Sequence, residues 1–141
     1  MAMVTVLAAL VALIAAAALA IDVGLVMVAR TQLQNATDAA ALAGAANLID
    51  KSGPTVTLTA AQNAVHSQAA LNKSVAEAVP DGVAVAAADI AVGKWDFATH
   101  TFNSSVDVSD PDEVNAVDVT TRQDGIANSP VPTIMARIVG R

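Results

Sequence analysis

The sequence predicts an α+β fold in which a long N-terminal hydrophobic helix is followed by a second helix and a small antiparallel sheet. Three observations support this. Residues 1–29 contain no Lys, Arg or Pro and a single acidic residue, Asp22. An Ala-rich helical pattern then continues without a break to the first proline, Pro54. From residue 83 onward, short apolar stretches alternate with polar residues between turn-forming sequences, which is typical of strands.

The first helix is expected to extend from residue 2 to about residue 50. Residues 2–21 contain Thr5 as their only polar side chain, and about 20 such residues are needed to cross the hydrocarbon core of a bilayer. At 1.5 Å per residue the helix would be roughly 70 Å long, more than twice the ~30 Å core, so about half of it must project from a membrane. Gly53 and Pro54 end the helix, because glycine permits the cap and proline cannot continue it.

Large and small side chains are segregated along this helix. Large residues recur three or four positions apart, at Val4, Leu7, Val11, Ile14, Ile21, Leu25 and Val28. Small residues recur every four positions, at Ala8, Ala12, Ala16, Ala20 and Gly24, and the row resumes at Ala36, Ala40 and Gly44. Rows of small residues let helix backbones approach closely, so these small residues are predicted to be helix-packing or assembly contacts.

The chain divides into a helical domain of residues 1–53 and a small α+β head of residues 54–141. A second helix is predicted over about residues 60–79, with Thr57 or Thr59 as its N-cap. Its apolar positions, which roughly follow the helical period, are Ala61, Val65, Ala69, Leu71, Val75 and Val79. Strand patterns follow at residues 83–85 and 90–97, at residues 102–106 after a hairpin turn at 98–101, and at residues 114–121.

Three residues, Trp95, Phe97 and Phe102, supply the aromatic content of the chain, which is only 2%. A buried aromatic ring removes a large apolar area from water, so these side chains are expected to anchor the core of the sheet. The alternative is an exposed patch on which a ligand stacks.

The composition argues against several classes of function. The net charge of −6 argues against a nucleic-acid partner, which needs a basic face. The chain has no Cys, so disulfides, thiolate catalysis and zinc–thiolate sites are excluded. His66 and His100 lie far apart and are not expected to bind a metal. The acidic residues at positions 107–113 lack the spacing of a calcium loop and are expected to be solvated. No catalytic cluster and no cofactor site is predicted, so the chain is not expected to be an enzyme.

Two strings in the sequence carry a family resemblance. Asp22-Val23-Gly24 is followed by RTQLQNATDAAALAGA at residues 30–45, which resembles the start of TadE/TadG-like proteins of the tight adherence (Tad, or Flp) pilus system. The family pattern has Ala where this chain has Thr37. Later pieces at residues 92–96, 115–120 and 130–140, together with Phe102, resemble the family's C-terminal region. The resemblance implies a bacterial, exported, membrane-inserted protein with pilin-like features.

The acidic residue at the edge of the apolar run admits two interpretations. A carboxylate at the edge of lipid is costly unless it is paired or hydrated. Asp22 could be a registration contact that meets the amino terminus or Arg30 of a neighbouring chain, as an acid near the mature amino terminus does in type IV pilins. Alternatively, Asp22 is hydrated and unpaired at the membrane–water interface.

Two functional hypotheses follow. In the first, the chain is a structural pilin-like subunit that polymerises through its N-terminal helix into an adhesive surface filament. Its partners would be copies of itself, membrane lipid before assembly, and the Tad pilus machinery. In the second, it is a minor pilin or assembly factor that stays tethered to the inner membrane with a periplasmic domain. Because no basic residue precedes the apolar run, Met1 is either the translation start or follows a cleaved leader.

Overall fold

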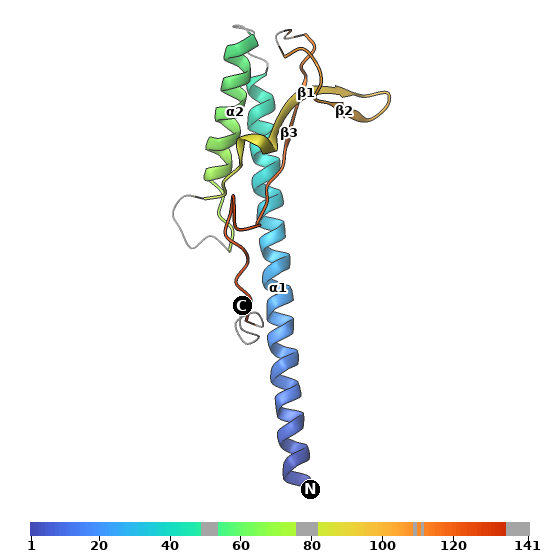
Figure 1. Ribbon diagram of the computed structural model, residues 1–141, viewed down its shortest axis with the longest axis vertical. Coiled ribbons are helices and arrows are strands. Elements are labelled where there is room, and N and C mark those ends of the chain that lie inside the picture. The colour runs from blue at the N-terminus through green and yellow to red at the C-terminus, as the bar shows by residue number, and fades with distance from the viewer. Residues whose placement is uncertain (49–53, 76–81, 109, 111, 135–141) are drawn as a thin grey trace.

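The computed structural model describes residues 1–48, 54–75, 82–108, 110 and 112–134, and shows a long helix with a small head packed along its C-terminal half (Figure 1). The elements are α1 (Ala2–Asn47), α2 (Pro54–Ala70), the short 3-10 helix η1 (Ala87–Asp89), β1 (Ile90–Asp96), β2 (Thr101–Asn103) and β3 (Ala116–Val119). The predicted α+β fold is confirmed.

The long N-terminal helix is confirmed and forms a single element of 46 residues. Ala and Leu, which have high helix propensity, dominate it, and no proline interrupts it. α1 ends slightly before the predicted residue 50, where the amide of Asn47 donates to the carbonyl oxygen of Ala43 at 2.8 Å. Residues 49–53, which include the predicted stop at Gly53, lie outside the described residues.

The predicted boundaries of the second helix are wrong at the N-terminal end. α2 begins at Pro54 rather than near residue 60, because proline has no N–H and the first turn of a helix leaves that N–H unpaired. α2 ends at Ala70, where the side chain of Asn72 donates to the carbonyl of Gln68 at 2.9 Å and so terminates the ladder. The last predicted positions, 76–79, lie outside the described residues.

The core of the head joins both helices to the sheet. Its buried cluster consists of Ala40 from α1, Val65 and Ala69 from α2, Val85, Ile90 from β1 and Val119 from β3. The predicted apolar face of α2 is confirmed at Ala61, Val65 and Ala69, all with no exposed area. Leu71, predicted to continue this face, is 76% exposed because α2 has already ended.

The sheet has the strand order β2-β1-β3, and both pairs are antiparallel. The predicted hairpin is confirmed, with Trp95 opposite Phe102 and Asp96 opposite Thr101. Val83 and Val85 are buried and Ala84 is exposed, as their alternation predicts, but this segment is irregular rather than a strand.

The prediction that the aromatic side chains anchor the core is wrong. Phe97 lies in the hairpin turn and is 77% exposed, while Trp95 and Phe102 are half-buried and pair across strands outside the core cluster. Successive side chains of a strand point to opposite faces. Trp95 is an odd number of residues from Ile90, so it lies on the face directed away from the helices.

Lowering the pH is expected to loosen the hairpin turn. The backbone N–H groups of Ala98 and Thr99 donate to one carboxylate oxygen of Asp96, at 2.7 and 3.2 Å. These bonds, that of Ala98 first, hold the pKa of Asp96 below the ordinary 3.8. A carboxyl group whose pKa falls on folding stabilises the fold above its unfolded pKa, and this contribution is lost as pH falls through the folded pKa. NMR titration should therefore show the Ala98 amide shifting below pH 3.8; Asp96→Asn should abolish this shift.

Candidate assembly and membrane surface

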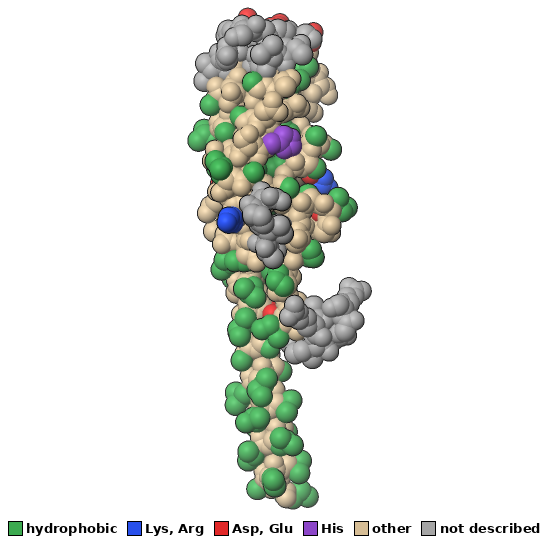
Figure 2. Space-filling model, turned by 90° about the vertical axis from the view of Figure 1, so that its left-hand side faces the viewer, with side chains coloured by type: hydrophobic (Ala, Val, Ile, Leu, Met, Phe, Trp, Pro, Cys, Tyr) green, Lys and Arg blue, Asp and Glu red, His purple; other side chains and the backbone are tan. Residues whose placement is uncertain are grey.

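The first part of α1 has no cover from the rest of the chain. We call residues 1–21 the stalk; all of them are exposed except the half-buried Ala18. Large apolar side chains such as Met3 and Leu13 are 88% and 71% exposed, and Figure 2 shows hydrophobic side chains around the whole visible face of the stalk. Among the described residues, α1 is the only helix long and apolar enough to cross a membrane. The burial of α1 begins at Asp22 and continues at Ala29, Ala36, Ala40 and Gly44.

The small-residue row of α1 divides into two parts with different environments. Ala8, Ala12, Ala16, Ala20 and Gly24 are exposed. A Cβ added at Gly24 would meet no atom within 4 Å. Ala36, Ala40 and Gly44 are buried inside the chain's own head. A Cβ added at Gly44 would lie 2.7 Å from a methyl carbon of Val65, so this glycine lets α1 and α2 approach closely. Close helix packing in the upper part is therefore internal to the subunit.

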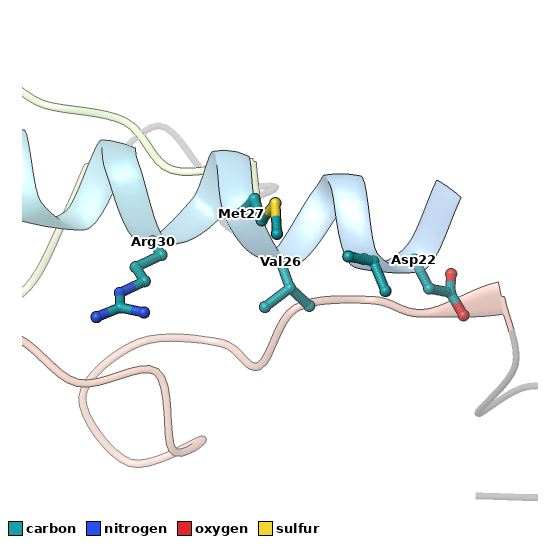
Figure 3. Close-up of a pocket in the computed structure, with 5 residues that line it drawn as sticks. Asp22, Val26, Met27 and Arg30 are labelled. Atoms are coloured by element: carbon teal, nitrogen blue, oxygen red, sulfur yellow. The ribbon is translucent and has the colours of Figure 1, made fainter. Parts of the chain in front are cut away.

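Asp22 marks the junction of stalk and head. It is 6% exposed, and its carboxylate oxygen accepts a hydrogen bond of 2.7 Å from the backbone N–H of Ile134, 112 residues away. In Figure 3 the carboxylate points toward the returning C-terminal part of the chain. The interpretation of Asp22 as hydrated and unpaired is therefore wrong, because the side chain is buried and accepts a hydrogen bond from the backbone of Ile134. Its predicted contact with a neighbouring chain stays a prediction.

Arg30 lies two turns above Asp22 and is exposed. The two residues and the apolar side chains between them, Val23, Val26 and Met27, line a shallow groove with a volume of ≈ 360 Å³ (Figure 3). We call it the Asp22–Arg30 groove. Eight residues of helix separate the two charges by about 12 Å, so a contact between them would have to involve two different chains.

Sequence reasoning missed the bonds that tie α1 to distant parts of the chain. The side-chain oxygen of Gln32 accepts from the backbone N–H of Val75 at 2.7 Å. The hydroxyl oxygens of Thr37 and Thr121 lie 2.6 Å apart. Thr37 was the one departure from the family pattern, and a hydroxyl in an Ala-rich row was the available signal for this contact. Gln32 carried no comparable signal.

Three charged residues, Asp89, Arg122 and Asp124, form contacts within the head. Arg122 forms an ion pair with Asp89, and its Nε donates to Asp89 at 3.0 Å. The side-chain hydrogen bond with Asp89 raises the pKa of Arg122 above its ordinary value. The N–H groups of Ile126 and Ala127 lower the pKa of Asp124. His66 and His100 are exposed on α2 and the hairpin turn. The described residues contain no group of three or more His, Asp or Glu arranged to hold a metal ion.

Comparison with known families accounts for both halves of the chain. Residues 1–47 match the Flp pilus-assembly TadE/G-like family, and residues 43–141 match the Tad-like Flp pilus-assembly family. The first match covers α1 and the second covers the head, meeting where the two pack together. No curated protein and no solved structure matches the chain. With both of its parts matched, the chain belongs to the Tad-like family of Flp pilus-assembly proteins.

Proposed function

We propose that this chain is a structural, pilin-like subunit of the Tad/Flp pilus with no catalytic step of its own. The stalk holds the subunit in the inner membrane before assembly. It then packs against the equivalent helices of further copies in the core of a surface filament, while the head faces outward and serves adhesion. The supporting observation is the stalk itself, an apolar helix segment that the described part of the chain leaves uncovered. Large apolar surfaces of this kind mark protein or membrane contacts.

The same stalk also supports the second candidate, a membrane-tethered minor pilin or assembly factor. Residues 2–21 would span about 30 Å as a helix, which matches the hydrocarbon core of one bilayer. The part of α1 that the head covers begins directly afterwards, at Asp22. A tethered protein needs the stalk to be apolar, but it does not need closely approaching helices. Packing at the small-residue row therefore separates the two candidates.

A Gly24→Leu change tests close packing without disturbing the subunit. Because an added Cβ at Gly24 meets nothing within 4 Å, the isolated chain should fold and insert as before. A neighbouring helix could no longer approach this position, so the amount of chain in sheared filaments should fall by about tenfold, equivalent to about 1.4 kcal/mol. The measurement is immunoblotting of sheared filaments and of the inner-membrane fraction from the same cells.

A matched control places the same bulk elsewhere on the helix. Ala18 occupies the one small position in the stripe of large residues, so Ala18→Leu adds similar volume on the side away from the small-residue row. Because Ala18 is half-buried, an unchanged amount in the inner-membrane fraction must first show that this variant folds and inserts. It should leave the filament fraction within about twofold of the unsubstituted protein. Equal filament content for Gly24→Leu and the unsubstituted protein would count against the filament subunit and favour the tethered factor.

A further inference from the structure

The apolar part of α1 is longer than a bilayer requires. Residues 2–29 contain no charge other than Asp22, and as a helix they would extend roughly 42 Å, against a hydrocarbon core of ~30 Å. A uniformly apolar helix of this length can tilt or take up several depths at small cost. The apolar character of α1 therefore does not by itself fix which of its residues enter the hydrocarbon.

The contact at Asp22 divides this apolar part at one position. Below it the stalk is exposed. Above it Ala29 is 1% exposed because the head covers it, while Val26 and Met27 between them remain 47% and 65% exposed. The donor to Asp22, the N–H of Ile134, belongs to the last described part of the chain, which returns along α1 to the junction (Figure 1). The bond therefore anchors the returning chain to the helix at the level where the apolar stalk begins.

We propose that Asp22 is a positioning residue that sets how deeply α1 enters the membrane, by docking the C-terminal segment, residues 131–134, against the helix. This inference rests on the proposed membrane insertion of the stalk. The docked segment brings backbone N–H and C=O groups to the helix surface, and such groups cannot enter hydrocarbon while unpaired. The segment then acts as a stop at residue 22, and about twenty residues are left for the bilayer.

Without the contact between Asp22 and Ile134, α1 should enter the membrane more deeply. In Asp22→Leu, the apolar run would continue without a charge to Arg30, and Ile134 would lose its acceptor. Residues 23–29, including Val26, could then enter the hydrocarbon by up to about 10 Å of sliding or tilt. Asp22→Asn keeps a side-chain oxygen that can accept from Ile134, so it should hold the original depth.

The native chain has no Cys, so single cysteines report depth without background. We would place one at Val26, which is 47% exposed, and one at Leu10, which is 53% exposed, in the full-length protein in proteoliposomes. A membrane-impermeant maleimide should label position 26 and spare position 10. With Asp22→Leu, labelling at position 26 should fall at least about fivefold, whereas Asp22→Asn should stay within about twofold, because only leucine removes the acceptor.

A second pair of variants tests the same bond from its donor. Ile134→Pro removes the N–H, because proline has none, and should protect position 26 as Asp22→Leu does. Ile134→Ala keeps the N–H and should not.

Labelling of position 10 in the otherwise unsubstituted chain would contradict the proposed membrane insertion itself. Protection of position 10, with labelling at position 26 unchanged by Asp22→Leu and Ile134→Pro, would overturn the positioning role alone. Loss of labelling in Asp22→Asn equal to that in Asp22→Leu would also overturn it, because charge rather than docking would then set the depth.

Discussion

Replacing Gly82 by alanine is expected to lower the free energy of unfolding of the head by more than about 3 kcal/mol, the range that only severe backbone or core damage reaches. Gly82 has a φ of +70°, and a Cβ there would lie 1.8 Å from the carbonyl oxygen of Ala70. The obstructing atom is backbone at the end of α2, so no side-chain rotation can relieve the overlap. The next residue, Val83, is buried and donates its N–H to Asn72 at 2.8 Å, so moving the chain away would break that bond as well.

Gly125→Ala is the matched control, because it carries the same conformational strain without the overlap. Gly125 has a φ of +84°, but its nearest neighbour to an added Cβ is a ring carbon of Pro130 at 3.9 Å. The change should cost only the strain of a left-handed residue, about 1–2 kcal/mol. Urea unfolding in detergent micelles, followed by the fluorescence of Trp95, the single tryptophan, measures both. Equal losses in the two variants would mean that the contact with Ala70 does not constrain the fold.

The elements that could be predicted from the sequence are those determined by residues close together in the chain. α1 follows from a continuous helical pattern without proline, and the β1–β2 hairpin follows from alternation around a short turn. The start of α2 could not be read in the same way, because Pro54 both ends one helix pattern and opens the next helix. The prediction that Trp95 is buried in the core was wrong for a different reason. Hydrophobicity indicates that a side chain prefers to be buried, but the strand's alternation decides which face it occupies.

The features of the candidate surface also differ in whether neighbouring residues in the sequence or contacts with distant residues determine them. The stalk and its small-residue row could be identified from spacing alone. The bond between Asp22 and Ile134 could not, because its donor is a backbone N–H, a group that nearly every residue carries. Ala36, Ala40 and Gly44 continue the exposed row in sequence but face the chain's own head. The spacing of small residues therefore shows where another helix can pack closely. The fold of the head determines whether that helix belongs to the same chain or to another one.

Asn128→Leu is expected to destabilise the head by about 3 kcal/mol, since three part-buried hydrogen bonds are lost and each contributes about 1 kcal/mol net. Asn128 is 4% exposed. Its oxygen accepts from the N–H of Ala84 at 2.7 Å, and its amide donates to the carbonyls of Ala84 and Arg122 at 2.9 and 2.8 Å. The side chain thus pairs with the irregular segment around Ala84 as a neighbouring strand would. Leucine has the same number and branching of side-chain heavy atoms, but it leaves all three backbone groups without this partner.

Asn115 is the matched control for Asn128, because its side-chain amide also pairs with backbone groups but does so at an exposed position. Its oxygen accepts from the N–H of Trp95 at 2.6 Å, and its amide donates to the carbonyl of Trp95 at 3.2 Å. Water can replace both bonds once the side chain is removed, so Asn115→Leu should cost under about 1 kcal/mol. If both variants lost the same stability in urea unfolding, the number of bonds would matter and burial would not. A loss confined to Asn128→Leu would show that this buried amide replaces a missing strand, which explains how residues 83–85 keep their alternating burial without belonging to the sheet.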